Sequence, residues 1–116
     1  MRRLFPIVLL LTIAASRQAL AQDADAKALY GDNCKKCHGV LGNPPQTMKK
    51  KYPKIVAFDA PFLEKHTEDS IVVILTKGGK SEDMESFKGK LSTAEMKAVA
   101  KYVRELAGKA KPGGGD

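Results

Sequence analysis

The stretch Cys34-Lys35-Lys36-Cys37-His38 is the one around which the rest of this 116-residue chain is expected to fold. It holds both cysteines of the chain and one of its two histidines. A C-x-x-C-H motif is typical of c-type haem attachment. Two thiols one helical turn apart can add to the haem vinyl groups, and the neighbouring imidazole can bind the iron. The motif therefore predicts one covalent haem c on Cys34 and Cys37, with His38 as proximal ligand.

The N-terminus has the pattern of an export signal. Two arginines precede an apolar stretch from Leu4 to Ala15, and Ala19-Leu20-Ala21 is typical of a cleavage site. The apolar stretch is short for a membrane span, although an uncleaved anchor is the alternative. Residues 1–21 are therefore predicted to be a cleaved signal peptide, which would place the protein in a bacterial periplasm.

Removing the leader leaves 95 residues, enough for one small domain. The leader contains three arginines and no acidic residue, so the formal net charge falls from +7 to +4. This mildly basic charge favours an acidic protein partner, and no basic–aromatic pattern indicates nucleic-acid binding. We expect residues 22–108 to form the domain and residues 109–116, with one proline and three glycines, to form a flexible tail.

The mature chain is predicted to be all-α, with three to five helices. A first helix is expected from Asp25 to Lys36, with an aspartate capping its first turn. Gly39 to Pro53 has the composition of a loop, with a short helical turn possible from Gln46 to Tyr52. Asp59 to His66 is expected to form another short helix, with an aspartate cap and an early proline.

The following segment could be a strand or a helix. Ile71-Val72-Val73-Ile74-Leu75 is rich in β-branched residues, which favour a buried strand. Thr67 offers an N-cap before two acidic residues, however, and Gly78-Gly79 can end a helix. No partner strand is evident elsewhere, so we expect a helix.

The last helix has the clearest signals. Ser92 and Glu95 form a capping box, and Leu91 and Met96 occupy the positions of a hydrophobic staple. Gly108 can close the helix. An apolar face continues through Val99, Val103 and Leu106.

The second axial ligand of the iron decides the chemistry of the haem. Met96 is accounted for by the staple, and His66 follows a lysine in a polar setting, which indicates an exposed side chain. Met48 follows His38 by only ten residues, too few to reach the opposite haem face and still wrap the ring. Met84 is 46 residues away in a loop before the last helix, and it is the predicted distal ligand.

These features resemble the class I (bacterial, monohaem) cytochrome c family from Ala24 to about Ala107. Met84-Glu85-Ser86-Phe87 is similar to the Met-Pro-x-Phe segment of the family, with Glu85 where proline is expected. This departure leaves the loop less constrained in φ. The resemblance implies a small fold wrapped around the haem, with the first and last helices crossing near the motif. It also implies a proline carbonyl that accepts the second N–H of His38, for which Pro45 is the candidate.

The predicted function is that of a soluble, monomeric, periplasmic electron carrier that exchanges one electron with redox partner proteins and has no substrate of its own. Candidate walls of the haem pocket are Phe62, Phe87, Tyr52 and Ile74. Candidates for a basic rim facing acidic partners are Lys35, Lys36, Lys49, Lys50, Lys51, Lys80 and Lys88.

Two other classes of protein are alternatives to the electron carrier. The first is a haem enzyme or gas-binding sensor in which Met84 is displaceable. The second has no haem, and would use the cysteines for thioredoxin-like chemistry or for zinc. Thioredoxin-like chemistry calls for a βαβ pattern, which is absent. Adjacent Cys37 and His38 cannot easily bind one tetrahedral zinc ion together with Cys34 and a distant His66.

Overall fold

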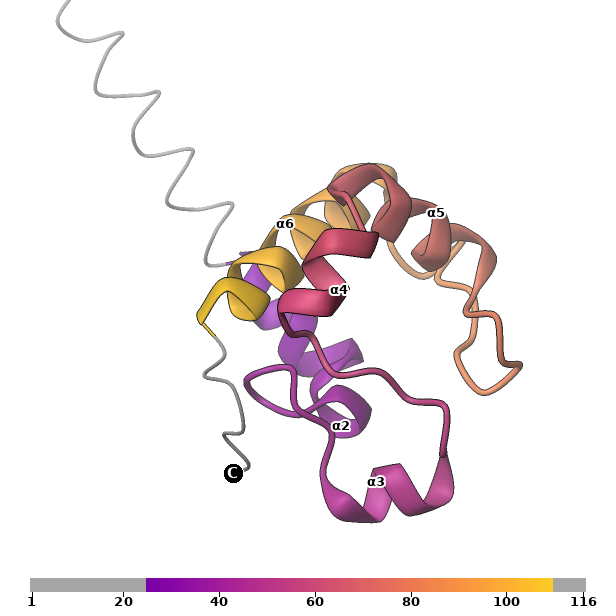
Figure 1. Cartoon of the computed structure of the whole chain (residues 1–116). Coiled ribbons are helices and arrows are strands. Elements are labelled where there is room, and N and C mark those ends of the chain that lie inside the picture. The colour runs from indigo at the N-terminus through magenta and orange to yellow at the C-terminus, as the bar shows by residue number, and fades with distance from the viewer. Residues whose placement is uncertain (1–24, 110–116) are drawn as a thin grey trace, which may run out of the picture.

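Helices make up the fold that the structure, a computed structural model, describes over residues 25–109 (Figure 1). A first helix covers residues 25–33. The labelled helices that follow are α2 (Lys35–His38), α3 (Gln46–Lys51), α4 (Ala60–Lys65), α5 (Glu68–Lys77) and α6 (Thr93–Lys109). Between residues 25 and 109 there is no strand, only an isolated bridge between Lys88 and Leu91. The all-α prediction is confirmed.

Several predictions about the ends of the chain lie outside the described residues. The predicted signal peptide at 1–21 is one of them, and most of the predicted tail is another. Lys109, predicted to begin that tail, is instead the last residue of α6, and Gly108 lies inside the helix rather than closing it. Within residues 25–109, none of the helices is both long enough and apolar enough to cross a bilayer.

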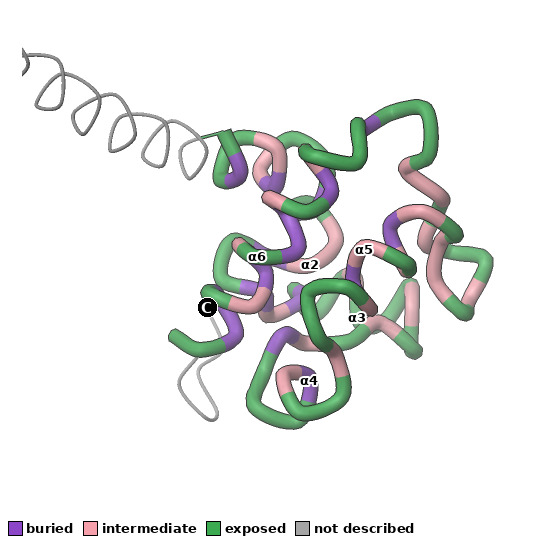
Figure 2. Tube along the Cα trace, turned by 90° about the horizontal axis from the view of Figure 1, so that it is seen from above, coloured by how far each residue is buried: buried purple, intermediate pink, exposed green. Residues whose placement is uncertain are grey.

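Helix α6 is the element against which the first helix, α4 and α5 pack. The predicted capping box is present: the Glu95 N–H donates to Ser92 Oγ at 3.1 Å, and the Ser92 N–H donates to Glu95 Oε1 at 3.0 Å. Both staple residues, Leu91 and Met96, are buried. Buried positions recur every three to four residues along the helix, with exposed positions between them (Figure 2), as an apolar face on one side of a helix requires. Its buried residues are Met96, Val99, Ala100, Val103, Leu106 and Ala107.

Helices α4 and α5 both pack on α6, and each begins at its predicted cap. Asp59 accepts the Phe62 N–H at 3.0 Å before α4, and Thr67 Oγ1 accepts the Ser70 N–H at 3.2 Å before α5. The β-branched segment in α5 is therefore helical, as predicted. Local capping and the terminating glycines outweigh its strand propensity, because a strand there would leave its backbone without a partner.

The first helix is shorter than predicted. It ends at residue 33, and Cys34 adopts a non-helical conformation (φ −123°, ψ −38°) before α2 begins at Lys35. Backbone hydrogen bonds continue across this break, from the Cys34 N–H to Tyr30 O (2.8 Å) and from the His38 N–H to Cys34 O (2.9 Å). The attachment motif is thus a separate helical turn that remains hydrogen-bonded to the helix before it.

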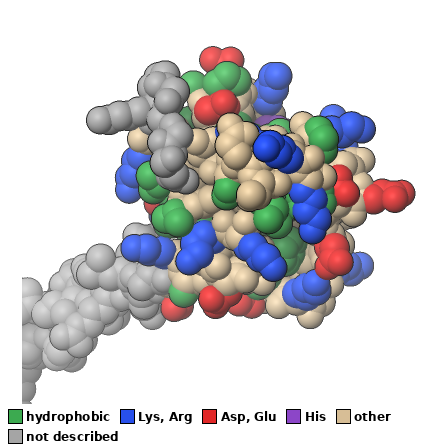
Figure 3. All heavy atoms as spheres, turned by 90° about the horizontal axis from the view of Figure 1, so that it is seen from below, with side chains coloured by type: hydrophobic (Ala, Val, Ile, Leu, Met, Phe, Trp, Pro, Cys, Tyr) green, Lys and Arg blue, Asp and Glu red, His purple; other side chains and the backbone are tan. Residues whose placement is uncertain are grey.

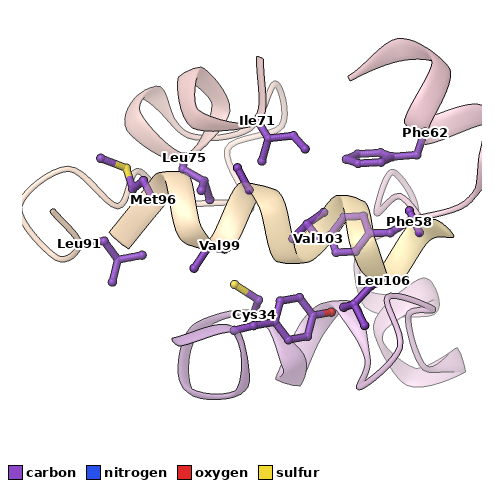
Figure 4. Packing of buried hydrophobic residues seen from close by; sticks show 13 residues of the cluster. Cys34, Phe58, Phe62, Ile71, Leu75, Leu91, Met96, Val99, Val103 and Leu106 are labelled. Atoms are coloured by element: carbon purple, nitrogen blue, oxygen red, sulfur yellow. The ribbon is translucent and has the colours of Figure 1, made fainter. Parts of the chain in front are cut away.

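A single apolar cluster joins the first helix, α4 and α5 around α6 (Figure 4). The predicted crossing of the first and last helices is present, since the Tyr30 and Tyr102 ring centroids lie 5.3 Å apart and Ala26 is buried. Cys34 points toward the side of α6 that carries Val99 (Figure 4). The cluster consists of Tyr30, Cys34, Phe58, Phe62, Ile71, Leu75, Leu91, Met96, Val99, Ala100, Val103, Leu106 and Ala107.

The capping box gives the first testable prediction. Ser92→Ala removes the acceptor for the Glu95 N–H and should lower the free energy of unfolding by about 1 kcal/mol. Urea denaturation of the oxidised protein measures the change. Thr93→Ala is the matched control, because Thr93 is the neighbouring exposed residue and makes no capping bond. Equal destabilisation by the two variants would show that the cap contributes nothing.

Candidate haem site

Cys34 and Cys37 form no disulfide and are held one helical turn apart. Cys34 is buried and Cys37 is half-buried, and the Cys37 N–H donates to Cys34 O at 3.2 Å. Burial, and to a lesser extent the nearby Cys37, raise the pKa of the Cys34 thiol to about 11. Since no disulfide uses the two sulfurs, both side chains are available for covalent attachment.

The His38 imidazole lies against the aromatic ring of Phe58. The two ring centroids are 4.8 Å apart and the planes differ by only 18°. Burial lowers the pKa of His38, while hydrogen bonding to the Val56 backbone opposes that shift. Nδ1 of His38 is buried without a hydrogen-bond partner that meets ordinary distance and angle criteria. The lowered pKa favours the neutral imidazole, which is the form that binds a metal.

The prediction for the carbonyl that orients His38 was wrong. The Pro45 carbonyl accepts the N–H groups of Met48 (2.9 Å) and Lys49 (3.0 Å) at the start of α3. Val56 supplies the backbone group next to the imidazole instead. The reason is that α3 begins immediately after Pro45, so its first free N–H groups take that carbonyl.

The attachment turn is closed by a hydrogen bond from the tyrosine hydroxyl one turn before it. Tyr30 Oη donates to the carbonyl of Gly39 at 2.6 Å, and the bond is buried. Burial is the main cause that raises the pKa of Tyr30, with smaller effects from Cys34 and Tyr102. The hydroxyl therefore stays protonated and keeps donating. This bond fixes the position of the motif relative to the helix that carries it.

Met84 lies in the loop between α5 and α6, half-buried against the apolar cluster that contains Cys34. The Gly79 N–H donates to the Met84 carbonyl at 3.0 Å, and the Met84 N–H donates to Ser81 O at 3.4 Å. Gly78 has φ +90°, and a Cβ there would lie 3.0 Å from the Met84 carbonyl oxygen. The two glycines after α5 therefore allow the backbone of Met84 to pack closely against them.

The rest of this loop is anchored to the end of α5. Ser86 Oγ donates to the Thr76 carbonyl at 2.6 Å, and the Phe87 N–H donates to the Leu75 carbonyl at 2.7 Å. Glu85, which stands where the resembled family has proline, faces solvent and pairs with Lys90 at 2.9 Å. Lys90 lowers the pKa of the Glu85 carboxyl. Hydrogen bonds from Ser86 and Phe87 thus restrain the loop without the φ restriction of a proline.

The other predicted site residues have mixed outcomes. His66 was predicted to be exposed, but it is half-buried with its ring 4.5 Å from that of Phe62. Phe62 lies in the apolar cluster and Phe87 packs against it. Met96 belongs to the core, as predicted. Phe58 and Val56 were missed, because they lie in an irregular segment with no periodic pattern to mark them.

The zinc alternative finds no support in the arrangement of side chains. Over residues 25–109 no group of three or more histidine, cysteine, aspartate or glutamate side chains converges as a metal site would require. The cluster contains Cys34, and both Met84 and the His38–Phe58 ring pair lie against it. Two cysteines one turn apart, an imidazole that contacts the cluster through Phe58 and a thioether packed on the same cluster form a donor set that suits a covalent haem.

The comparisons with known proteins agree with this donor set. Residues 21–103 match the family described as "Cytochrome C oxidase, cbb3-type, subunit III". The chain is 37% identical over 95 residues to cytochrome c6 of Synechocystis sp., which covers 78% of this chain and 72% of that protein. It is 35% identical over 97 residues to the cbb3-type cytochrome c oxidase subunit FixP of Azorhizobium caulinodans, but spans only 31% of that protein.

A solved structure is similar as well. The KustC0563 c-type cytochrome shares 34% identity with a TM-score of 0.62, covering 70% of this chain and 95% of its own. The helical fold and the attachment motif define a c-type cytochrome. The chain belongs to the cytochrome c family, as a cbb3-type cytochrome c domain, and it carries covalently bound haem c. It is thus a haem protein of electron transport.

The Met84 loop gives the second prediction. Gly78→Ala should weaken the predicted ligation by Met84, because the new Cβ would meet the Met84 carbonyl oxygen at 3.0 Å and the Ser86 nitrogen at 3.2 Å. Gly89→Ala is the matched control, since Gly89 has a similar φ of +86° with no atom within 4 Å. Both variants should lose about 1–3 kcal/mol of stability from backbone strain. Only Gly78→Ala should also reduce the far-red methionine-to-iron band of the ferric spectrum. Equal spectra for the two variants would show that close packing at Gly78 does not hold Met84 in place.

Proposed function

We propose that this protein carries one electron at a time between redox partner proteins in a bacterial periplasm, and that its haem iron is bound by His38 and Met84. The observation that carries the proposal is the shared apolar cluster. Cys34 belongs to it, His38 reaches it through Phe58, and Met84 packs on it from a restrained loop. When bound, haem c supplies a one-electron iron couple.

Each residue has a distinct part in this function. Cys34 and Cys37 hold the cofactor through thioether bonds, so that it is not lost in a dilute compartment. His38 contributes a neutral nitrogen donor. Met84 contributes a soft thioether, which favours the reduced iron and raises the potential relative to two nitrogen ligands. With His38 and Met84 both bound to it, the iron would have no coordination site left for a substrate, so the protein would exchange electrons only.

The ferric optical spectrum tests the proposal. A methionine-to-iron charge-transfer band in the far red is expected, together with resistance to cyanide. The alternative is a haem enzyme or gas sensor with a displaceable Met84, and the exposed Glu85 in place of proline is the feature that favours it. A high-spin spectrum, or rapid cyanide binding, would overturn the proposed carrier and support that alternative.

The surface is suited to partners with acidic docking faces. All seven lysines of the proposed basic rim are exposed. On the face drawn in Figure 3, basic side chains are spread widely and acidic ones lie among them. A diffuse basic surface of this kind orients a partner in the encounter rather than fixing it tightly.

The proposed periplasmic location rests on the leader pattern at residues 1–21.

Charge on this surface gives a third prediction. Electron transfer to an acidic partner should slow by roughly tenfold between about 0.01 M and 0.15 M salt, since the screening length falls from about 30 Å to about 8 Å. Stopped-flow spectroscopy measures the rate. Replacing Lys49, Lys50 and Lys51 with glutamine should flatten the salt dependence. Rates that do not respond to ionic strength would exclude the basic rim.

A further inference from the structure

Four rings form a continuous column that starts at the haem motif. The His38 and Phe58 centroids are 4.8 Å apart, those of Phe58 and Phe62 are 4.9 Å apart, and those of Phe62 and His66 are 4.5 Å apart. The angle between planes is smallest, 18°, for the first pair. The column therefore runs from the imidazole of the attachment turn, through the segment before α4, to the end of α4.

Phe58 is held on several sides apart from its contact with His38. Its N–H donates to the Gly42 carbonyl at 2.8 Å, and Gly42 has φ +81°. A Cβ at Gly42 would lie 2.8 Å from the Phe58 ring, so only glycine permits this approach. Tyr30 contacts the same ring edge-on, at 6.5 Å between centroids. Phe58 is 7% exposed, and its ring has little freedom to move.

The far end of the column is fixed by an arginine from α6. The Arg104 guanidinium donates to the carbonyls of Leu63 and His66, which are free acceptors at the C-terminal end of α4. This contact ties α4 to α6, the longest helix of the described chain. Phe62 in α4 therefore contacts Phe58 from a fixed position, and Phe58 in turn contacts His38.

We propose that Phe58 is a positioning residue that sets the plane of the His38 imidazole. The inference rests on the proposed role of His38 as proximal ligand. A parallel ring at 4.8 Å blocks rotation of the imidazole on that face. The plane of an axial imidazole determines how unpaired spin is distributed over the haem in the ferric state. Phe58 thus acts on the iron through His38, although it is not itself a ligand.

Proton NMR of the reduced holoprotein tests this without any substitution. Nuclear Overhauser contacts between the His38 and Phe58 ring protons are expected. The haem ring current should also shift the His38 ring protons strongly upfield. Upfield-shifted His38 protons without contacts to Phe58 would overturn this inference alone. Unshifted His38 protons would instead show that the proposed ligation by His38 is wrong.

Substitutions then distinguish positioning from simple packing. Phe58→Leu keeps an apolar side chain but removes the flat face, so the order of the haem methyl resonances in the ferric spectrum should change. The reduction potential should also fall, because water gains access to the imidazole. Phe58→Tyr keeps the ring and should retain the original order. Ile71→Val is the matched control, because Ile71 is buried on α5 and is not part of the ring column.

The outcomes separate clearly. A changed methyl order in Phe58→Leu, with the original order in Phe58→Tyr and Ile71→Val, supports positioning. An unchanged order in Phe58→Leu, with a loss of stability similar to that of Ile71→Val, would show that Phe58 is ordinary core and would overturn the proposal. If Phe58→Leu fails to fold, the native protein still provides a test, because the absence of contacts between the His38 and Phe58 ring protons would overturn the proposal.

Discussion

Replacement of Met84 by alanine is expected to lower the reduction potential by a sizeable fraction of the roughly 0.8 V range that axial ligands span. The substitution removes the thioether that is proposed to bind the iron, and a thioether ligand favours the reduced state. The far-red band should disappear, and cyanide should bind readily to the ferric protein. Redox titration and optical spectroscopy of the purified holoprotein measure both effects.

Two other methionines provide controls for this variant. Met48 is half-buried on α3, and Met96 is buried in the staple of α6. Met48→Ala should leave the potential and spectrum unchanged. Met96→Leu should change only stability, by less than about 1.5 kcal/mol. If Met48→Ala abolished the far-red band while Met84→Ala kept it, the assignment of the distal ligand would be wrong.

Replacement of both Cys34 and Cys37 by alanine is expected to abolish covalent haem attachment. No pigment should remain with the polypeptide after acid–acetone extraction, and the helical circular dichroism signal should fall sharply. A chain of this size has a small apolar core and depends on its cofactor for stability. Pyridine haemochrome spectra and far-ultraviolet circular dichroism measure the two losses.

The residues between the cysteines offer a matched control for this double variant. Lys35 and Lys36 lie in the same turn with exposed side chains. Lys35→Ala combined with Lys36→Ala should keep both pigment and helicity, since neither side chain supports the motif. If pigment stayed with the double cysteine variant after acid–acetone extraction, covalent attachment at these positions would be contradicted.

The parts of the fold that the sequence predicted well depend on neighbouring residues. The capping box at Ser92 and the caps at Asp59 and Thr67 involve partners three residues away, so they can be recognised in a linear pattern. The helical assignment of α5 followed from its cap and its terminating glycines. The apolar stripe of α6 gave the core residues, because burial there follows helical periodicity.

The parts that were missed depend on contacts between distant segments. Phe58 lies in an irregular segment, and its contact with His38 depends on the path of the chain between them. His66 was expected in solvent because its neighbours are polar, yet its ring packs on Phe62. Tertiary packing decides such contacts, and the sequence has no short-range signal for them. The prediction for Pro45 failed for a more local reason, since the first turn of α3 takes its carbonyl.

The hydrogen bond from the Tyr30 hydroxyl to the Gly39 carbonyl has a consequence for the speed of electron exchange. It closes the segment from residue 30 to residue 39 into a ring that contains both cysteines and His38. Because burial raises the pKa of Tyr30 above its usual value, the hydroxyl stays protonated at neutral pH and this ring persists there. A ligand segment that cannot shift when the iron changes charge keeps the inner-sphere reorganisation energy small. Tyr30→Phe should therefore slow self-exchange of electrons even where the potential is unchanged.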